Sequence, residues 1–261
     1  MTYDYYPGCT LKNKALSLGI GAEKAAEILG VQMKELPEWQ CCGGAYPMCG
    51  NETVQKLPSV RALENAKNNG RPLITVCSAC YHVLKSVNYD MKNNPTVQKK
   101  ANTYLENENW YNGETRVIHY LEMLRDDVGF DRVRANVKNP LNKKIAAYYG
   151  CMLLRPSKII DFDDAENPSV MENLIKALGG EAVIYPFRNE CCGGYIAAED
   201  KDAAEKNSRR IIESAASHGA EMIVTACPLC MYNLKKYSEI PVKYFTEILC
   251  DAFGVEVTAD D

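Results

Sequence analysis

The strongest constraint on the fold of this chain is a cysteine pattern that it contains twice. Each copy has one cysteine, then two adjacent cysteines followed by two glycines, and then a Cys-x-x-Cys motif. The gap between the adjacent pair and the Cys-x-x-Cys motif is 34 residues in both copies, which is hard to obtain by chance. The first copy is Cys9, Cys41, Cys42, Cys77 and Cys80, and the second is Cys151, Cys191, Cys192, Cys227 and Cys230. Such self-similarity indicates a duplicated domain.

The sequence around these cysteines is repeated as well. YYPGC at 5–9 corresponds to YYGC at 148–151, ITVCSAC at 74–80 to VTACPLC at 224–230, and HYLEML at 119–124 to YFTEIL at 244–249. The polar segment RVRANVKNPLNKK, which contains Asn-Pro, lies just before the second copy. We therefore expect a first cysteine-rich repeat over residues 1–135, a linker over 136–142 and a second repeat over 143–261.

In each half, short β-type runs alternate with helical patterns, which indicates βαβ units on a mainly parallel sheet. The sequence thus predicts an α/β protein with two pseudo-symmetric, Rossmann-like halves. The expected strands are 2–6, 31–36 and 72–76 in the first half and 145–149, 181–185 and 222–226 in the second. The expected helices are 15–29, 52–69, 168–178 and 201–218, with further helices beginning right after each Cys-x-x-Cys motif.

This arrangement places every cysteine of the repeat just after the carboxyl end of a strand. Because these ends meet at one crevice of a doubly wound sheet, we expect each half to gather its five cysteines into one pocket. Nearby helix N-termini lower the pKa of a thiol, and the glycines allow the backbone N–H groups to approach sulfur. The sequence therefore predicts two equivalent thiol sites.

Composition excludes several classes of function. Thirty basic and thirty-four acidic residues give a net charge of −4, without the basic patch of a nucleic-acid-binding protein. We find no secretion signal and no run of eighteen apolar residues, so we expect a cytoplasmic protein without a membrane span. Cytosolic thiols are kept reduced, so the twelve cysteines indicate metal or redox chemistry, not a disulfide framework.

The number of cysteines in each set limits the kind of metal site. A structural zinc ion takes four ligands, and an ordinary cubane 4Fe-4S cluster also takes four thiolates, usually from a compact run that this chain lacks. Five cysteines are one too many for either site. They suggest a cluster that is not a plain cubane, while structural zinc in one or both halves remains the alternative.

The pattern C…CCG…CxxC, present twice, resembles the CCG cysteine-rich repeat found in the B subunit of heterodisulfide reductase and its relatives. The resemblance covers nearly the whole chain. It implies that each repeat binds a noncubane 4Fe-4S cluster, in which two smaller iron-sulfur units share an iron, with all five cysteines as ligands. The implied ligands are Cys9, Cys41, Cys42, Cys77 and Cys80 for one cluster and Cys151, Cys191, Cys192, Cys227 and Cys230 for the other.

The same resemblance implies a function. A disulfide substrate would enter between the two clusters, its S–S bond would break with each sulfur captured at an iron, and two electrons and two protons would release two thiols. The alternatives are an electron-transfer subunit that passes electrons to a quinone or other acceptor, and a zinc-stabilised scaffold without a redox role.

The electrons for such a reaction would have to come from other subunits. The chain has no ferredoxin-type cysteine run, and GIGAEK at 19–24 has Lys24 where the third glycine of a dinucleotide-binding motif belongs. The family implies a ferredoxin-like 4Fe-4S subunit and a flavin-containing subunit as partners.

A few other residues are candidates for a role beside the cysteines. His82, two residues after Cys80, could donate a proton to a leaving thiolate, although a solvent-facing or capping role is the simpler interpretation. Cys49 and Cys250 lie outside the repeat, and we expect them to be ordinary free or buried thiols.

The evidence for a functional role is weaker for the tyrosines and arginines of this chain. The tyrosines before the first cysteine of each copy are expected in the core, and several arginines could bind an anionic substrate, but the sequence does not place them at the site. These residues are Tyr5, Tyr6, Tyr148, Tyr149, Arg71, Arg155 and Arg188.

Overall fold

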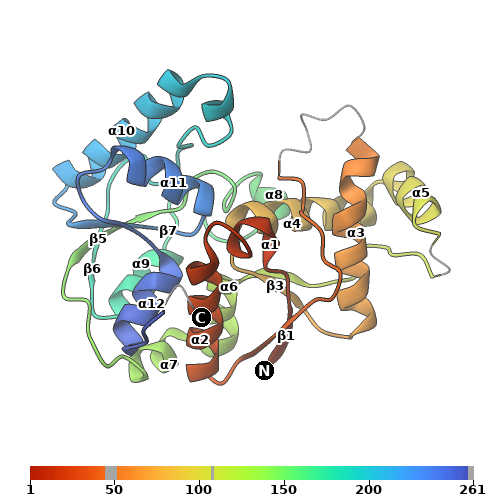
Figure 1. Cartoon of the computed structure of the whole chain (residues 1–261), viewed down its shortest axis with the longest axis horizontal. Coiled ribbons are helices and arrows are strands. Elements are labelled where there is room, and N and C mark those ends of the chain that lie inside the picture. Colours follow the sequence, from red (N-terminus) through yellow and green to blue (C-terminus); the bar gives the residue numbers. More distant parts are fainter. Residues whose placement is uncertain (45–51, 107–108, 258–261) are drawn as a thin grey trace.

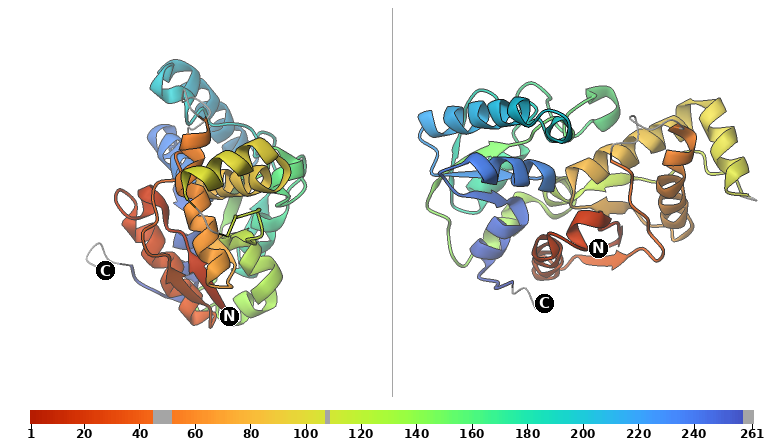
Figure 2. Two further views of the ribbon diagram at one scale, coloured as in Figure 1. Left: turned by 90° about the vertical axis from the view of Figure 1, so that its right-hand side faces the viewer. Right: turned by 45° about the horizontal axis from the view of Figure 1, so that its top comes forward.

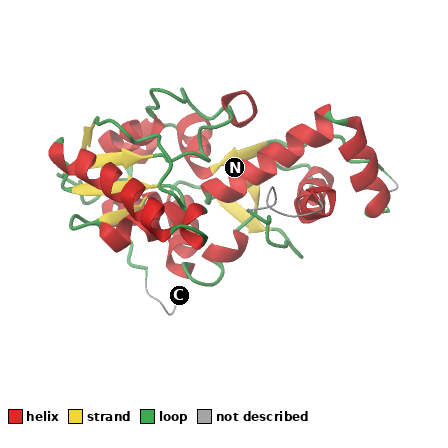
Figure 3. Cartoon of the chain, turned by 90° about the horizontal axis from the view of Figure 1, so that it is seen from above, coloured by secondary structure: helices red, strands yellow, loops and turns green. Residues whose placement is uncertain are grey.

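The computed structural model describes residues 1–44, 52–106 and 109–257 and contains two four-stranded sheets (Figure 1). Their strand orders are β2-β1-β3-β4 and β6-β5-β7-β8, and all neighbouring strands in both are parallel. Figure 3 shows the strands of both sheets lying between helices. The two sheets have the same topology, which confirms the predicted α/β fold with two repeated halves.

The first half contains most of its helices between strands. Its elements are β1 (Thr2–Tyr5), α1 (Gly8–Leu11), α2 (Leu16–Ile28), β2 (Gln32–Glu35), α3 (Glu52–Asn68), β3 (Leu73–Thr75), α4 (Ser78–Asn93), α5 (Pro95–Tyr104), β4 (Val117–His119), α6 (Tyr120–Glu122), the π-helical turn η2 (Met123–Val128) and α7 (Phe130–Ala135).

The second half repeats the order of the strands, with a shorter connection between its third and fourth strands. Its elements are β5 (Lys144–Tyr148), α8 (Ser157–Ile160), α9 (Val170–Ala177), β6 (Glu181–Val183), the 3-10 turn η3 (Ile196–Ala198), α10 (Lys201–Ser217), β7 (Met222–Thr225), α11 (Pro228–Tyr237), β8 (Val242–Tyr244) and α12 (Phe245–Phe253).

The strands that lead into Cys77, Cys151 and Cys227 are mostly apolar and lie inside the sheets. All residues of β3 and β7 are buried, as are all but the first of β5. Parallel strands that are covered by helices on both faces have such continuous apolar runs, whereas half-exposed strands alternate. Burial of these strands fixes the positions at which the cysteine-bearing loops leave the sheets.

The fourth strand of each sheet was not predicted. β4 and β8 end at the first residue of the repeated segments HYLEML and YFTEIL, and a helix follows each strand immediately. In both, a glutamate three residues on accepts a hydrogen bond from the last strand residue: His119 N to Glu122 Oε2 at 2.7 Å, and Tyr244 N to Glu247 Oε2 at 2.6 Å. This is half of a capping box, and it explains why the sequence similarity extends to these segments.

The helices after the Cys-x-x-Cys motifs begin earlier than predicted. α4 starts at Ser78 and α11 at Pro228, so Cys77 and Cys227 are the N-cap residues, and the helices start inside the motif, not after it. Proline is favoured at the first position of a helix, because its missing N–H would have no helical partner there. The second cysteine of each motif therefore lies in the first helical turn, beside the N-terminal backbone N–H groups.

The two halves are interlocked. The C-terminal helix α12 of the second half packs along α2 of the first, and both views in Figures 1 and 2 show them side by side. Thr246 Oγ1 donates a hydrogen bond to Leu18 O at 3.0 Å, and the buried Cys250 Sγ lies 3.3 Å from Gly21 O. Within the segment expected to be a linker, Lys138 N donates to Ala252 O at 2.8 Å, so this segment lies against the second half.

We expect the buried His119, at the end of β4, to make the stability of the fold depend on pH. Its Nε2 donates to Val76 O at 3.2 Å, its Nδ1 accepts from Leu121 N at 3.2 Å, and burial lowers the pKa of His119 to about 3. The unfolded chain takes up this proton near pH 6.5 and the native chain does not, so stability is lost as pH falls below about 6.5.

Between pH 7 and 5.5 we expect this residue to account for a loss of about 1 kcal/mol in the free energy of unfolding. Urea unfolding of the wild type and His119→Gln at both pH values tests this, since the variant should lose that part of the pH dependence. Equal pH dependence in both proteins would contradict the prediction.

Candidate metal centre

The structure brings the five cysteines of the first set together at the carboxyl ends of β1 to β3. Cys9 Sγ lies 3.5 Å from Cys41 Sγ, and Cys42 Sγ lies 3.6 Å from Cys80 Sγ. Cys41 and Cys42 are hydrogen-bonded to each other, as are Cys77 and Cys80, so the five thiols form one connected group. Cys9 and Cys41 are exposed, while the other three are buried.

The second set is built in the same way. Cys192 Sγ lies 3.5 Å from Cys230 Sγ, and hydrogen bonds join Cys151 to Cys191 and Cys227 to Cys230. Gly193 N donates to Cys191 Sγ at 3.3 Å, as expected for a glycine backbone that approaches sulfur. Cys151 and Cys191 are half-buried and the other three cysteines of this set are buried, so none of the five described thiols is fully exposed.

The thiols of each set share their protons. Hydrogen bonds from neighbouring thiols lower the pKa of Cys42, with Cys41 the larger contributor and Cys80 the next. The hydrogen bond to Cys42 in turn raises the pKa of Cys41. In the second set, the hydrogen bond with Cys151 lowers the pKa of Cys191 and raises that of Cys151. Because metals bind thiolates, loading either set with metal would release these shared protons.

Two glycines make room for the thiols. Gly8 precedes Cys9 with φ +75°, and a Cβ on it would lie 2.7 Å from Cys80 Sγ. Gly150 precedes Cys151 with φ +67°, and its Cβ would lie 3.2 Å from Cys230 Sγ. Both positions favour glycine for its left-handed backbone and for the close approach of sulfur. From the sequence, we expected a role only for the glycines after the adjacent cysteines. A role for Gly8 and Gly150 was not predicted, although each precedes a cysteine.

Two tyrosines hold the loop that carries the adjacent cysteines. Tyr6 Oη donates to Gln40 O, and Tyr148 Oη donates to Glu190 O at 2.7 Å; each acceptor immediately precedes an adjacent pair. Each tyrosine lies three residues before the first cysteine of its copy. All four tyrosines before these cysteines are buried, as expected, but the bracing role of these two was not predicted.

The two sets meet at the centre of the molecule. Ser78 Oγ donates to Ala226 O at 2.7 Å, and Tyr244 Oη lies 2.7 Å from both Val76 O and Ala226 O. Val76 and Ala226 immediately precede Cys77 and Cys227, so one tyrosine hydroxyl and one serine link the two Cys-x-x-Cys motifs. A hydroxyl shared between these carbonyls fixes the spacing of the two thiol sets.

Tyr195 is a residue of this region that was not predicted from the sequence. It follows Gly194 in the second half, yet its hydroxyl would lie 2.9 Å from a Cβ on Gly44 of the first half. Burial raises the pKa of Tyr195, and thiols of both sets, led by Cys227 and Cys42, raise it further. A difference between the two copies could have pointed to Tyr195, because the first copy has Ala45 at the corresponding position.

The other candidates have different surroundings. His82 Nδ1 donates to Met152 O of the second half at 3.2 Å, and burial lowers the pKa of His82. Cys49 lies outside the described residues. The three arginines are paired with acids of their own halves: Arg71 with Asp4 at 2.6 Å, Arg155 with Glu166 at 2.8 Å and Arg188 with Glu172 at 3.6 Å.

The thiol sets fit a cluster of several irons by their donor chemistry. Each supplies five sulfur donors from three strand ends, with glycines where sulfur comes close to the backbone. Within residues 1–44, 52–106 and 109–257, no three Cys, His, Asp or Glu side chains are arranged as ligands of a single metal ion. Ligation by these ten cysteines remains a prediction.

Comparison with known protein families matches this chain to one family. Residues 3–85 and 145–235 match the family described as CCG, the Cysteine-rich domain. The 8-methylmenaquinol:fumarate reductase membrane anchor subunit of Wolinella succinogenes is 30% identical over 97% of this chain and 92% of its own length. The B subunit of the ferredoxin/F(420)H(2)-dependent CoB-CoM heterodisulfide reductase of Methanosarcina acetivorans is 28% identical over 95% of this chain and 88% of its own.

One solved structure supports the fold. The crystal structure of a hypothetical protein from Helicobacter pylori has a TM-score of 0.74 and 15% identity, covering 98% of this chain and 49% of that one. In the part of the chain that the structure describes, we find no helix of the length and apolarity needed to cross a bilayer.

The matched domain occurs in two copies, and each contains one complete five-cysteine set. The relatives align over nearly the whole chain, so the similarity is not confined to the motifs. The chain therefore belongs to the CCG cysteine-rich domain family, as a protein like the B subunit of heterodisulfide reductase with two copies of the domain.

Proposed function

We propose that this chain is the catalytic subunit of a heterodisulfide reductase-like complex, which reduces a disulfide to two thiols at two noncubane 4Fe-4S clusters. The observation that carries the proposal is the pairing of two equivalent five-thiol sets across the centre of a duplicated fold. A disulfide has two equivalent reacting ends, and two matched sites would meet both ends at once. Holding both sulfurs in place makes bond cleavage effectively unimolecular.

In this proposal the first cluster is held by Cys9, Cys41, Cys42, Cys77 and Cys80, and the second by Cys151, Cys191, Cys192, Cys227 and Cys230. Bound there, the clusters supply electrons and iron sites that stabilise the thiolates formed from the substrate.

The protein's own contribution is positioning. Tyr6 and Tyr148 hold the loops of the adjacent cysteines, and the Tyr244 hydroxyl ties the two Cys-x-x-Cys motifs together. The buried hydroxyl of Tyr244 keeps the two Cys-x-x-Cys motifs at a fixed separation, and the part-buried bonds of Tyr6 and Tyr148 hold each adjacent pair within its own half.

The overall reaction needs a source of electrons. One disulfide, two electrons and two protons give two thiols, and in this proposal the thiols of the chain serve as ligands. The electrons would therefore arrive from a partner subunit with 4Fe-4S clusters or flavin. Support for a multisubunit assembly comes from relatives that are themselves named as reductase subunits.

A second candidate function is electron transfer to or from a quinone. It is favoured by the Wolinella relative, whose name refers to 8-methylmenaquinol:fumarate reductase. In that case the same two clusters would pass electrons onward, and no sulfur–sulfur bond would be broken.

The two candidates are separated by adding each oxidant to the anaerobically purified, reduced protein and recording EPR spectra. We expect a small-molecule disulfide to change the cluster signals and to be converted to thiol, which a thiol assay quantifies. A response to a quinone without any response to disulfides would replace the proposed function by the second candidate.

A further inference from the structure

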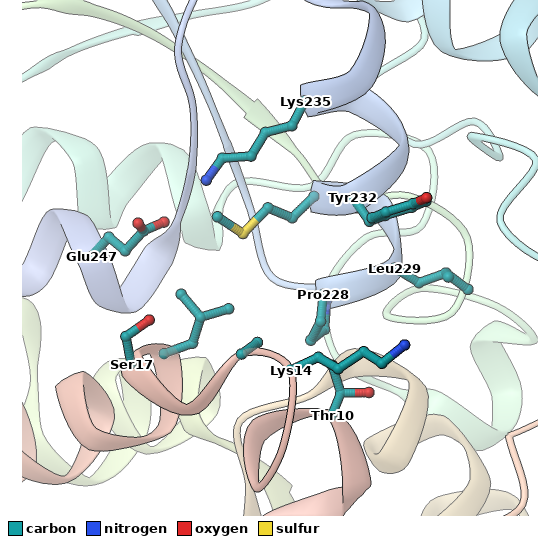
Figure 4. A pocket seen from close by; sticks show the side chains of 11 residues that line it. Thr10, Lys14, Ser17, Pro228, Leu229, Tyr232, Lys235 and Glu247 are labelled. Carbon is teal, nitrogen blue, oxygen red and sulfur yellow. The ribbon is translucent and has the colours of Figure 1, made fainter. Parts of the chain in front are cut away.

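A cavity of about 560 Å³ lies between the two halves, and its lining includes sequence neighbours of cysteines from both thiol sets. One wall is formed by residues that follow Cys9, and the opposite wall by the start of α11, with α12 at one end (Figure 4). Thr10 is the chain neighbour of Cys9, and Pro228 and Leu229 lie inside the second Cys-x-x-Cys motif. The cavity lining thus adjoins the first set in sequence on one side and the second set on the other, while none of the described cysteines lines it.

The duplication predicts a second cavity at the symmetry-related position, between the segment after Cys151 and the start of α4. That position is closed by direct contacts. His82 Nδ1 donates to Met152 O at 3.2 Å, and the buried Tyr81 Oη donates to Ile160 O of α8 at 3.0 Å. These two hydrogen bonds join α4 to the segment that would form the other wall.

At the open position, the residues that correspond to Tyr81 and His82 line the cavity. Met231 stands in the place of Tyr81, and Tyr232 in the place of His82, counted from the last cysteine of each motif. Both line the cavity, and the side chain of Tyr232 is 68% exposed. Access from solvent therefore differs between the two related positions, although the thiol sets are alike.

The open cavity carries a net positive charge. Its charged side chains are those of Lys14, Lys235 and Glu247, and Oε2 of Glu247 already accepts a hydrogen bond from Tyr244 N at 2.6 Å. Neither lysine forms an ion pair within the described residues, whereas the nearby Lys12 pairs with Glu35 at 2.5 Å. Leu18 and Met231 add apolar surface between the charged groups.

We infer that this cavity binds the carboxylate-bearing arm of the disulfide substrate, with Lys14 and Lys235 determining specificity. The identity of the reacting group rests on the proposed function. Two ammonium groups and one carboxylate leave a single positive charge, which suits a singly charged carboxylate better than a dianionic phosphate. The apolar lining accommodates a short aliphatic chain, and the sulfur end of the substrate then lies toward the cysteine sets.

The test uses 3,3′-dithiodipropionate and the neutral 2-hydroxyethyl disulfide with the anaerobically purified holoprotein. Lys14→Gln and Lys235→Gln should each raise the KM for the dicarboxylate about fivefold, the effect of one solvent-accessible charge contact. We expect kcat and the KM for the neutral disulfide to be unchanged. Lys236→Gln is the matched control, because it removes a lysine charge from the same helix outside the cavity.

Binding of dithiodipropionate to the oxidised protein, measured by calorimetry, separates the two proposals. Binding that both lysine substitutions weaken, without reduction in the assay, would support the cavity and overturn the proposed function. Reduction with equal KM in wild type and lysine variants would overturn the cavity and leave the function standing. Failure of the wild type to bind the dicarboxylate at millimolar concentration would also overturn the cavity.

Discussion

Replacing Cys42 by serine is expected to lower the iron content of the anaerobically purified chain from about eight to about four atoms. Cys42 is buried and lies between Cys41 and Cys80 in the first set. Its loss removes one of five donors from the middle of the group, so the first cluster should be lost while the second remains. Cys192→Ser should have the mirror effect on the second cluster, as measured by iron analysis and EPR.

Cys250→Ser is the control for this experiment. Cys250 is equally buried, but its Sγ lies against Gly21 O at the contact of α12 with α2, away from both sets. The control variant should retain all of its iron. Full iron content in both Cys42→Ser and Cys192→Ser would contradict ligation by five cysteines.

Gly8→Ala is expected to displace Cys80 and to cost the first cluster, which again halves the iron content. A Cβ on Gly8 would lie 2.7 Å from Cys80 Sγ, much closer than van der Waals contact, and φ at this residue is +75°. The left-handed backbone alone costs about 1 kcal/mol for a residue other than glycine. The effect on iron, by contrast, comes from the sulfur that the new methyl group displaces.

Gly70→Ala separates the two contributions. Gly70 has φ +65°, and a Cβ there would have no heavy atom within 4 Å. This variant should show the backbone cost in urea unfolding and keep its full iron content. If Gly8→Ala also keeps its iron, the close approach of Gly8 to Cys80 has no part in holding the cluster.

Much of the fold follows from the sequence because the signals were local and repeated. The apolar runs before Cys77 and Cys227 predicted β3 and β7, and parallel topology then placed both motifs at the same edge of their sheets. β4 and β8 escaped prediction because each passes directly into a helix, so no turn residue marks where the strand ends. The early start of α4 and α11 was missed because the cysteines themselves carry no helix signal.

Several other features depend on contacts between the halves. Tyr195 reaches Gly44, and His82 reaches Met152, across more than sixty residues of sequence. Sequence periodicity carries no information on such contacts. The cavity beside α11 could not be predicted for the same reason. Whether each of the two related positions is open or closed depends on the side chains there and not on the repeated motif.

Iron and acid-labile sulfide per chain test most directly whether each five-thiol set holds an iron-sulfur cluster. The anaerobically purified protein should contain about eight iron atoms and about eight sulfides per chain, four of each for either half. Zinc in place of iron, with no labile sulfide, would contradict cluster binding and leave a zinc-stabilised scaffold.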